Sequence, residues 1–150
     1  MQDTLQIKRP MLYHVVDRYP RADFISLNEP ELRLACHNRH DAVETLARAT
    51  AERLGAVAIS ITQGPAGLFT FDRNNGHCFR VPALATRVVD RVGAGDAFLA
   101  LAGLSLGSGV IPQIGAFIGA AAAALNVQIV GNRETISRVN LQKFITAILK

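Results

Sequence analysis

The sequence predicts an α/β fold: a doubly wound, mostly parallel sheet with flanking helices and an antiparallel hairpin at one edge. Short apolar segments alternate with longer segments whose apolar residues recur at helical spacing. Two strand-like runs flank residues 72–76 (Asp-Arg-Asn-Asn-Gly), a turn-forming sequence that predicts the hairpin. Because the chain has 150 residues, 49% of them hydrophobic, we expect one domain with a sizeable core.

The first part of the chain predicts a helix, a strand and a second helix. Residues 9–19 read as a short helix, since Pro10 suits a first helical turn and Pro20 would end the helix. Residues 23–27 form a short, mostly apolar strand, and residues 30–36 form the helix that follows it.

The middle of the chain predicts another helix, a buried strand and the hairpin. Asp41 is placed to cap a helix that runs to Leu54, and Gly55 is placed to end it. Residues 56–62 are the clearest buried strand. The remaining expected elements are the hairpin strands at 67–71 and 77–81, a short strand at Val88-Val89, helices at about 95–107 and 112–126, and an amphipathic helix at about 140–149 that begins at Asn140.

The most informative stretch is residues 90–96 (Asp-Arg-Val-Gly-Ala-Gly-Asp), where a turn of small residues leads into a helix. The first N–H groups of a helix lack intrahelical acceptors, and the helix dipole makes that end electropositive. Small side chains there let a phosphate approach the backbone. Asp96 then has two interpretations: it accepts a proton from a hydroxyl that attacks the phosphate, or it caps the helix.

Residues 90–96 resemble the Asp-Thr-X-Gly-Ala-Gly-Asp motif near the C-terminus of the PfkB (ribokinase-like) carbohydrate kinases. Residues 28–31 (Asn-Glu-Pro-Glu) resemble the Asn-X-X-Glu motif of that family, and residues 62–67 (Thr-Gln-Gly-Pro-Ala-Gly) resemble its Thr-X-Gly-X-X-Gly turn. The three motifs occur in the family's order. The resemblance covers about residues 20–130 and is strongest for the heptose-phosphate kinase type.

The resemblance implies a ribokinase-like fold and ATP-dependent phosphoryl transfer to a hydroxyl of a sugar or sugar phosphate, with ATP and Mg²⁺ as cofactors. It implies that Asp96 is the catalytic base and that the amides of Gly93, Ala94 and Gly95 form an anion hole. The other implied site residues are Asn28 and Glu31 for phosphate and Mg²⁺, Thr62, Gly64 and Gly67 for the nucleotide, and Asn126 beside the adenine.

Two positions depart from the family pattern, and one motif has a structural interpretation. Arg91 replaces the usual Thr and either reaches a substrate phosphate or points to water. Leu101 stands where a smaller residue is common, on the helix after the turn. Asn28 and Glu31 can also be read as a helix cap and a first-turn acid.

The family usually needs about twice this length, so residues 1–150 are expected to be the C-terminal half of a PfkB-type kinase domain, without the lid and the sugar-binding half. The alternatives are a non-catalytic nucleotide-binding module and a structural fragment that depends on a partner. A sheet that ends in mid-domain leaves an unpaired strand edge, so we expect self-association or a complementary N-terminal half.

Composition argues against several other classes. The net charge is +4, but the basic residues are scattered and do not interleave with aromatics, which argues against nucleic-acid binding. Cys36 and Cys78 match no zinc spacing, and two unpaired cysteines without a secretory signal indicate a reduced, cytoplasmic protein. The Gly-Ala-Gly-Asp turn lacks the third glycine of a Rossmann dinucleotide site.

The long uncharged stretch raises the question of a membrane. Residues 97–132 contain no Asp, Glu, Lys, Arg or His. Pro112 and the glycines near 107–109 divide this stretch into one segment too short to span a bilayer and one built from Gly and Ala. The sequence therefore predicts two buried helices and no membrane association.

Overall fold

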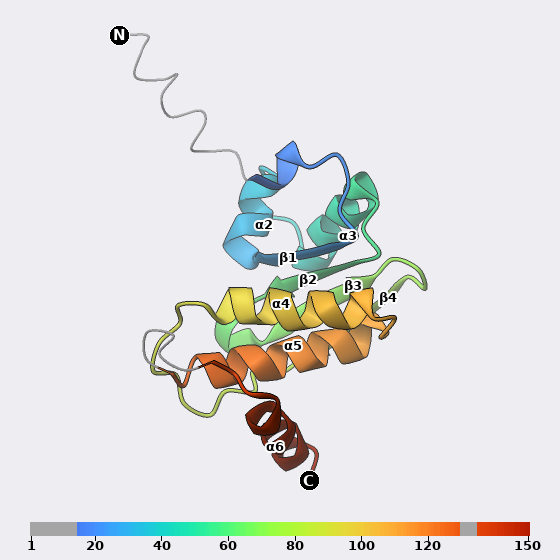
Figure 1. The fold of residues 1–150 in the computed structure, drawn as a ribbon. Coiled ribbons are helices and arrows are strands. Elements are labelled where there is room, and N and C mark those ends of the chain that lie inside the picture. The colour runs from blue at the N-terminus through green and yellow to red at the C-terminus, as the bar shows by residue number, and fades with distance from the viewer. Residues whose placement is uncertain (1–14, 130–134) are drawn as a thin grey trace, which may run out of the picture.

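The computed structural model describes residues 15–129 and 135–150, and these residues form a sheet with helices on both faces (Figure 1). The predicted helix at 9–19 lies mostly outside the described residues, as does the middle of the predicted loop at 128–139. The elements are the 3₁₀ turns η2 (Val15–Arg18) and η3 (Gly64–Ala66); the strands β1 (Phe24–Asn28), β2 (Ala58–Thr62), β3 (Leu68–Asp72) and β4 (His77–Val81); and the helices α2 (Glu29–Ala35), α3 (Val43–Leu54), α4 (Ala94–Gly107), α5 (Pro112–Asn126) and α6 (Arg138–Ile148).

The sheet has the order β1-β2-β3-β4. β1 pairs with β2 in parallel, whereas β3 and β4 are antiparallel to their neighbours. The predicted α/β class and the predicted hairpin are therefore confirmed. Within the described residues the sheet is mixed, because the hairpin supplies two of its strands. β1 is an edge strand of this sheet, although it is a parallel strand of the kind that is usually buried.

Alternating side chains along the strands build a core on each face of the sheet. Ile59 and Ile61 of β2 are fully buried and pack with β1, β3, α2 and α3 on one face. On the other face, Leu68 packs with Phe98 of α4 and residues of α5. The cross-strand partners Ser60 and Thr70 are buried and joined by a 2.8 Å hydrogen bond, which satisfies both hydroxyls.

α4 and α5 lie side by side across the second face (Figure 1). Their contact is close because Gly119 of α5 sits directly against Phe98 and Ala102 of α4. No helix in the described part of the chain has the length and hydropathy needed to cross a bilayer. The prediction of two buried helices is right for α5 but wrong for α4, which exposes Leu99 and Leu104.

The structure corrects three local predictions. α3 starts after Ala42 and has no side-chain cap; Asp41 accepts a hydrogen bond from the side chain of Asn38 instead. Val88-Val89 forms no strand. The C-terminal helix begins earlier than expected, at residue 138, and is capped by a serine hydroxyl that accepts from the amide of Asn140. By contrast, Gly55 ends α3 in the left-handed conformation, as predicted.

The contact between α4 and α5 predicts opposite effects for two glycine-to-alanine substitutions. A Cβ at Gly119 would lie 2.9 Å from the backbone oxygen of Phe98, so the helices must separate. We expect Gly119→Ala to lower the free energy of unfolding by about 1–3 kcal/mol. A Cβ at Gly103 would meet only ordinary contacts, so Gly103→Ala should be neutral or raise stability by up to about 1 kcal/mol. Urea unfolding followed by circular dichroism measures both, and equal effects would contradict the close contact.

Candidate active site

A cavity of about 960 Å³ opens where β1 and β2 end and α4 begins. Its walls come from four regions: the start of α2, the turn after β2, the segment between β4 and α4, and the C-terminal part of α5. The chain thus brings together segments nearly 100 residues apart. The predicted site residues that line the cavity are Asn28, Thr62, Gly64, Gly67, Arg91, Ala94 and Gly95. The other four, Glu31, Gly93, Asp96 and Asn126, lie outside its lining.

Asn28 and Glu31 form a capping box at the start of α2. The Asn28 Oδ1 accepts from the Glu31 amide at 2.8 Å, and the Glu31 Oε2 accepts from the Asn28 amide at 2.8 Å. The structural interpretation of this motif is therefore realised. Among the described residues, Oε1 of Glu31 has no hydrogen-bond partner, so one carboxylate oxygen remains available.

The turn after β2 holds two glycines with different constraints. The Gln63 amide donates to the Gly67 carbonyl at 2.8 Å and closes the turn. Gly67 has φ +88°, and a Cβ there would lie 2.9 Å from the carbonyl carbon of Pro82, so the fold itself requires glycine. Gly64 also has a positive φ, but a Cβ there would meet nothing within 4 Å. Gly64 therefore leaves open space on the cavity side of the turn.

A network of polar side chains that the sequence analysis missed connects the start of α2 to the turn after β2. Gln63 Nε2 donates to Glu29 Oε2 at 2.8 Å, and Arg33 contacts Glu29 Oε1 at 2.8 Å. Arg80 Nη1 in turn donates to Gln63 Oε1 at 3.2 Å. The hydrogen bond from Gln63, with the Arg33 guanidinium beside it, lowers the pKa of Glu29. The Glu29–Arg33 spacing was visible in the sequence, but the partner at Gln63 is 34 positions away and gave no signal.

The small-residue turn forms the N-terminus of α4. Gly93 is the N-cap in the left-handed conformation, with φ +82° and no side-chain cap. The amides of Gly95 and Asp96 lie in the first turn of a 14-residue helix, where intrahelical acceptors are lacking, whereas the Ala94 amide donates to the Arg91 carbonyl at 3.5 Å. Since Gly93 is the N-cap, the interpretation of Asp96 as the cap is wrong. The arrangement has the geometry of a helix N-terminus that binds an anion.

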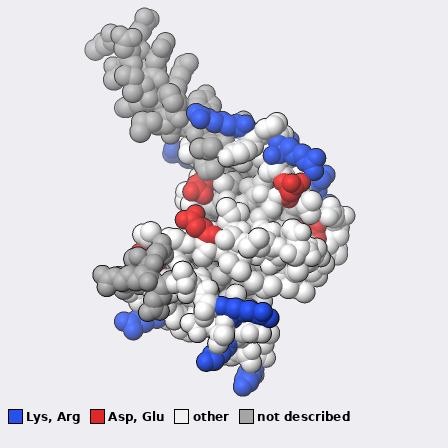
Figure 2. All heavy atoms as spheres, in the orientation of Figure 1, with Lys and Arg blue, Asp and Glu red and all other residues white. Residues whose placement is uncertain are grey.

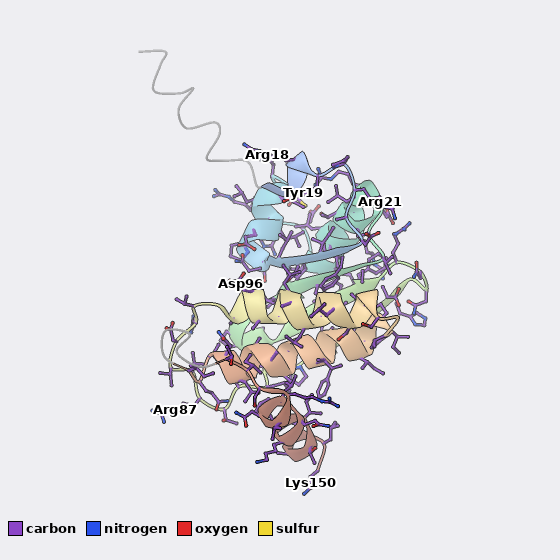
Figure 3. The ribbon with its side chains drawn as sticks, viewed as in Figure 1. Arg18, Tyr19, Arg21, Arg87, Asp96 and Lys150 are labelled. Carbon is purple, nitrogen blue, oxygen red and sulfur yellow. The ribbon has the colours of Figure 1, made fainter. Side chains whose placement is uncertain are left out.

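Asp96 lies in the first turn of α4 with an exposed side chain (Figure 3). Its carboxylate makes no hydrogen bond or ion pair with any described residue. Figure 2 shows acidic side chains gathered on the face where α2 and the start of α4 border the cavity. Asp96 is therefore accessible to a second molecule that approaches the helix N-terminus from outside.

Two arginines line the cavity in different states. Arg33 is held by the ion pair with Glu29 and donates to the carbonyls of Arg39 and Asp41. The side chain of Arg91 is exposed and has no ion-pair or hydrogen-bond partner within residues 15–129 and 135–150. Its guanidinium is therefore free to bind an oxyanion.

The opposite wall of the cavity is apolar. It is built by Leu84 and Val88 from the segment before α4 and by Ala120, Ala123 and Val127 at the end of α5. Asn126 is buried behind this wall and donates from Nδ2 to the Val92 carbonyl at 2.9 Å. The cavity thus combines an apolar slot with an electropositive helix N-terminus, a combination that fits a flat ring carrying phosphates.

Comparisons with known proteins agree with this geometry. The sequence pattern of the pfkB family carbohydrate kinases matches residues 4–138. The bifunctional protein HldE of Gluconacetobacter diazotrophicus is 34% identical over 133 residues, which is 83% of this chain and 27% of that protein.

Solved structures show the same fold. Ribokinase from Arabidopsis thaliana, solved with ribose and ATP, is 26% identical, with a TM-score of 0.73 over 87% of this chain and 43% of its own. Phosphofructokinase-2 from Escherichia coli, solved with substrates and products, is 18% identical, with a TM-score of 0.77 over 91% of this chain and 44% of its own. The chain spans less than half the length of these relatives. It has the ribokinase-like fold and belongs to the pfkB family of carbohydrate kinases.

Proposed function

We propose that this chain is the nucleotide-binding and phosphoryl-transfer half of an ATP-dependent sugar kinase. The observation that carries the proposal is the single cavity that joins the ends of all three motifs, with an apolar slot on one side and the N-terminus of α4 on the other. In this arrangement the adenine occupies the slot and the triphosphate extends toward Gly95.

Phosphoryl transfer then takes place at the start of α4. A sugar hydroxyl attacks the γ-phosphorus, its oxygen forms the new P–O bond, and the bond to the β–γ bridging oxygen breaks so that ADP leaves. Asp96 accepts the hydroxyl proton, which its exposed carboxylate is free to do. The amides of the Gly93–Gly95 turn stabilise the negative charge of the transferred group.

The residues present fit Mg²⁺ as a cofactor held mainly by the nucleotide. Within the described residues, no group of three His, Cys, Asp or Glu could hold a metal. Mg²⁺ in kinases usually keeps several waters and binds through one or two carboxylates together with substrate phosphates. The available Oε1 of Glu31 suits such a contact through water. When bound, Mg²⁺ neutralises charge on the phosphates.

The acceptor is proposed to be a sugar or sugar phosphate, and a heptose phosphate is the class that the motif resemblance favours. Arg91 supports a phosphorylated ligand, because it is a free cation beside Ala94 and Gly95 in the cavity wall. A reduced, cytoplasmic setting remains our expectation from the two free cysteines.

We further propose that residues 1–150 are the C-terminal half of the kinase domain. The chain aligns with only 44% of the Thermotoga maritima ribokinase, with a TM-score of 0.74. β1 is left at the edge of the sheet, and α4, which packs against β1, presents Leu99 and Leu104 to solvent. Figure 2 shows how little charge covers the middle of this face. A complementary half or a second copy would bury this surface.

Gly95 provides a direct test of phosphate binding. Gly95 has an ordinary helical φ and a Cβ there would meet nothing within 4 Å, so Gly95→Val should fold and crowd only the ligand. We expect Mg-ATP binding to weaken at least about tenfold by calorimetry, since a close backbone contact to phosphate is lost. Gly107→Val, at the other end of α4 with equally open space, is the control and should bind normally. Equal affinities in both variants would place the phosphate elsewhere.

Asp96→Asn tests the chemistry, in an enzyme where this chain is joined to the sugar-binding half of a pfkB kinase. The amide cannot accept the proton, so kcat should fall by about 10²–10⁴ while the affinity for ATP stays nearly unchanged. Glu52→Gln, which neutralises an exposed carboxylate on α3, should leave kcat unchanged. Steady-state kinetics with separate ATP titrations measure both, and near-normal turnover would remove Asp96 from the mechanism.

The isolated chain is expected to be at least a dimer at micromolar concentration and to show no measurable sugar phosphorylation, because its β1 edge and α4 leucines lack their partners. Leu104→Lys on α4 should shift the light-scattering mass toward the monomer. Leu149→Lys, at a similarly exposed site after α6, should leave the mass unchanged. A monomeric wild-type chain that phosphorylates a sugar unaided would contradict the half-domain proposal.

A further inference from the structure

The end of α5 is tied to the segment that precedes the α4 turn by three hydrogen bonds. The Val127 carbonyl accepts from the amides of Val89 at 2.7 Å and Asp90 at 3.0 Å. The third bond runs from Nδ2 of Asn126 to the Val92 carbonyl at 2.9 Å. The segment is irregular: Val88 and Val89 are half-exposed and belong to no strand. These hydrogen bonds are therefore what holds it against the end of α5.

Asn126 makes the only side-chain bond of the three, and it has the most direct effect on the turn. The Val92 carbonyl that it holds immediately precedes Gly93, the left-handed N-cap of α4. Asn126 itself is 7% exposed, so its amide is shielded from water and the bond is not easily replaced by solvent. The Val92 carbonyl, directly before the N-cap of α4, is therefore held by a side chain from α5.

The same helix end also forms part of the apolar slot. Ala123, one helical turn before Asn126, and Val127, directly after it, line the cavity, and Gly95 lines it on the turn side. The slot and the helix N-terminus are thus two walls of one cavity. Asn126 lies outside the lining and connects the two walls through its hydrogen bond to the Val92 carbonyl.

We propose that Asn126 is a positioning residue that couples the base side of the cavity to its phosphate side. It fixes the Val92 carbonyl and thereby keeps the start of α4, with the Gly95 amide, oriented toward the phosphates before the nucleotide binds. This role rests on the proposed nucleotide site, and it replaces the expectation that Asn126 borders the adenine. A preorganised turn loses less entropy on binding, so the benefit falls on the phosphate end of the ligand.

Hydrogen exchange on the unliganded chain tests the tie without depending on nucleotide binding. Asn126→Asp keeps the size of the side chain but replaces the donor amide with a carboxylate. We expect exchange of the amides in residues 89–96 to accelerate about tenfold, with α2, α3 and the sheet unchanged. Gln128→Met is the matched control. Gln128 lies two residues after Asn126, and this substitution removes its side-chain hydrogen bond to the Ala124 carbonyl without touching the turn.

A second readout protects the test against a variant that fails to fold. In the wild-type chain, NMR should show slowed solvent exchange of the Asn126 Nδ2 protons, whereas the exposed amide of Asn74 exchanges freely. Fast exchange of the Asn126 side-chain protons, or unchanged exchange at residues 89–96 in Asn126→Asp, would overturn the positioning role.

Ligand binding then tests the coupling. Calorimetry would compare Mg-ATP, magnesium tripolyphosphate and adenosine. We expect Asn126→Asp to weaken Mg-ATP and tripolyphosphate about tenfold and adenosine less than twofold, with Gln128→Met close to wild type. Equal losses for adenosine and tripolyphosphate would overturn the coupling. If the wild-type chain binds none of the three, the proposed nucleotide site fails, and the exchange experiments still decide whether Asn126 holds the turn.

Discussion

The close approach of α4 and α5 determines most of what this structure can do. Gly119 lets the backbones meet at Phe98 and Ala102, and the aligned pair then covers one face of the sheet. This contact brings the N-terminus of α4 beside the C-terminal end of α5. The cavity between them has an electropositive end and an apolar wall only because the two helices are fixed in this register.

The other half of the cavity depends on a polar network rather than on close packing. Glu29, Gln63, Arg33 and Arg80 connect α2, the turn after β2 and β4. Hydrogen bonds to the Glu29 carboxylate favour its charged form, as its lowered pKa reflects. Both carboxylate oxygens of Glu29 and the guanidinium of Arg33 are engaged within this network, so these residues form the cavity wall and are not available to bind a ligand. Arg91 is the cation left for a ligand in the described lining of the cavity.

The cavity and the sheet edge of the proposed half-domain differ in how completely they are enclosed. The cavity is enclosed on several walls, whereas Asp96 lies outside its lining and is exposed to solvent. Among the residues that the structure describes, β1 has no strand on one side, and α4 exposes large apolar side chains next to it. These features are consistent with an acceptor site that is built between this chain and a second element.

The sequence alone determined the fold class, the hairpin and the family. Hydrophobic spacing located β1, β2, α3 and α5 to within a few residues, because burial on a regular lattice leaves a periodic pattern. The three motifs identified the pfkB family, and seven of the site residues predicted from them line one cavity. The sequence also suggested a cap at Asn28, which needs only residues three apart.

Tertiary structure decided what depends on distant partners. Val88-Val89 has strand propensity but is held by the end of α5 instead of by a neighbouring strand. Asp41 has the position of an N-cap for α3 in the sequence, yet its carboxylate accepts a hydrogen bond from the Asn38 side chain instead. Gly67 is required because β4 returns against its backbone, and Asn126 reaches the turn at Val92. Such contacts leave no periodic trace along the chain, since they arise only when packing brings separate elements to the same point.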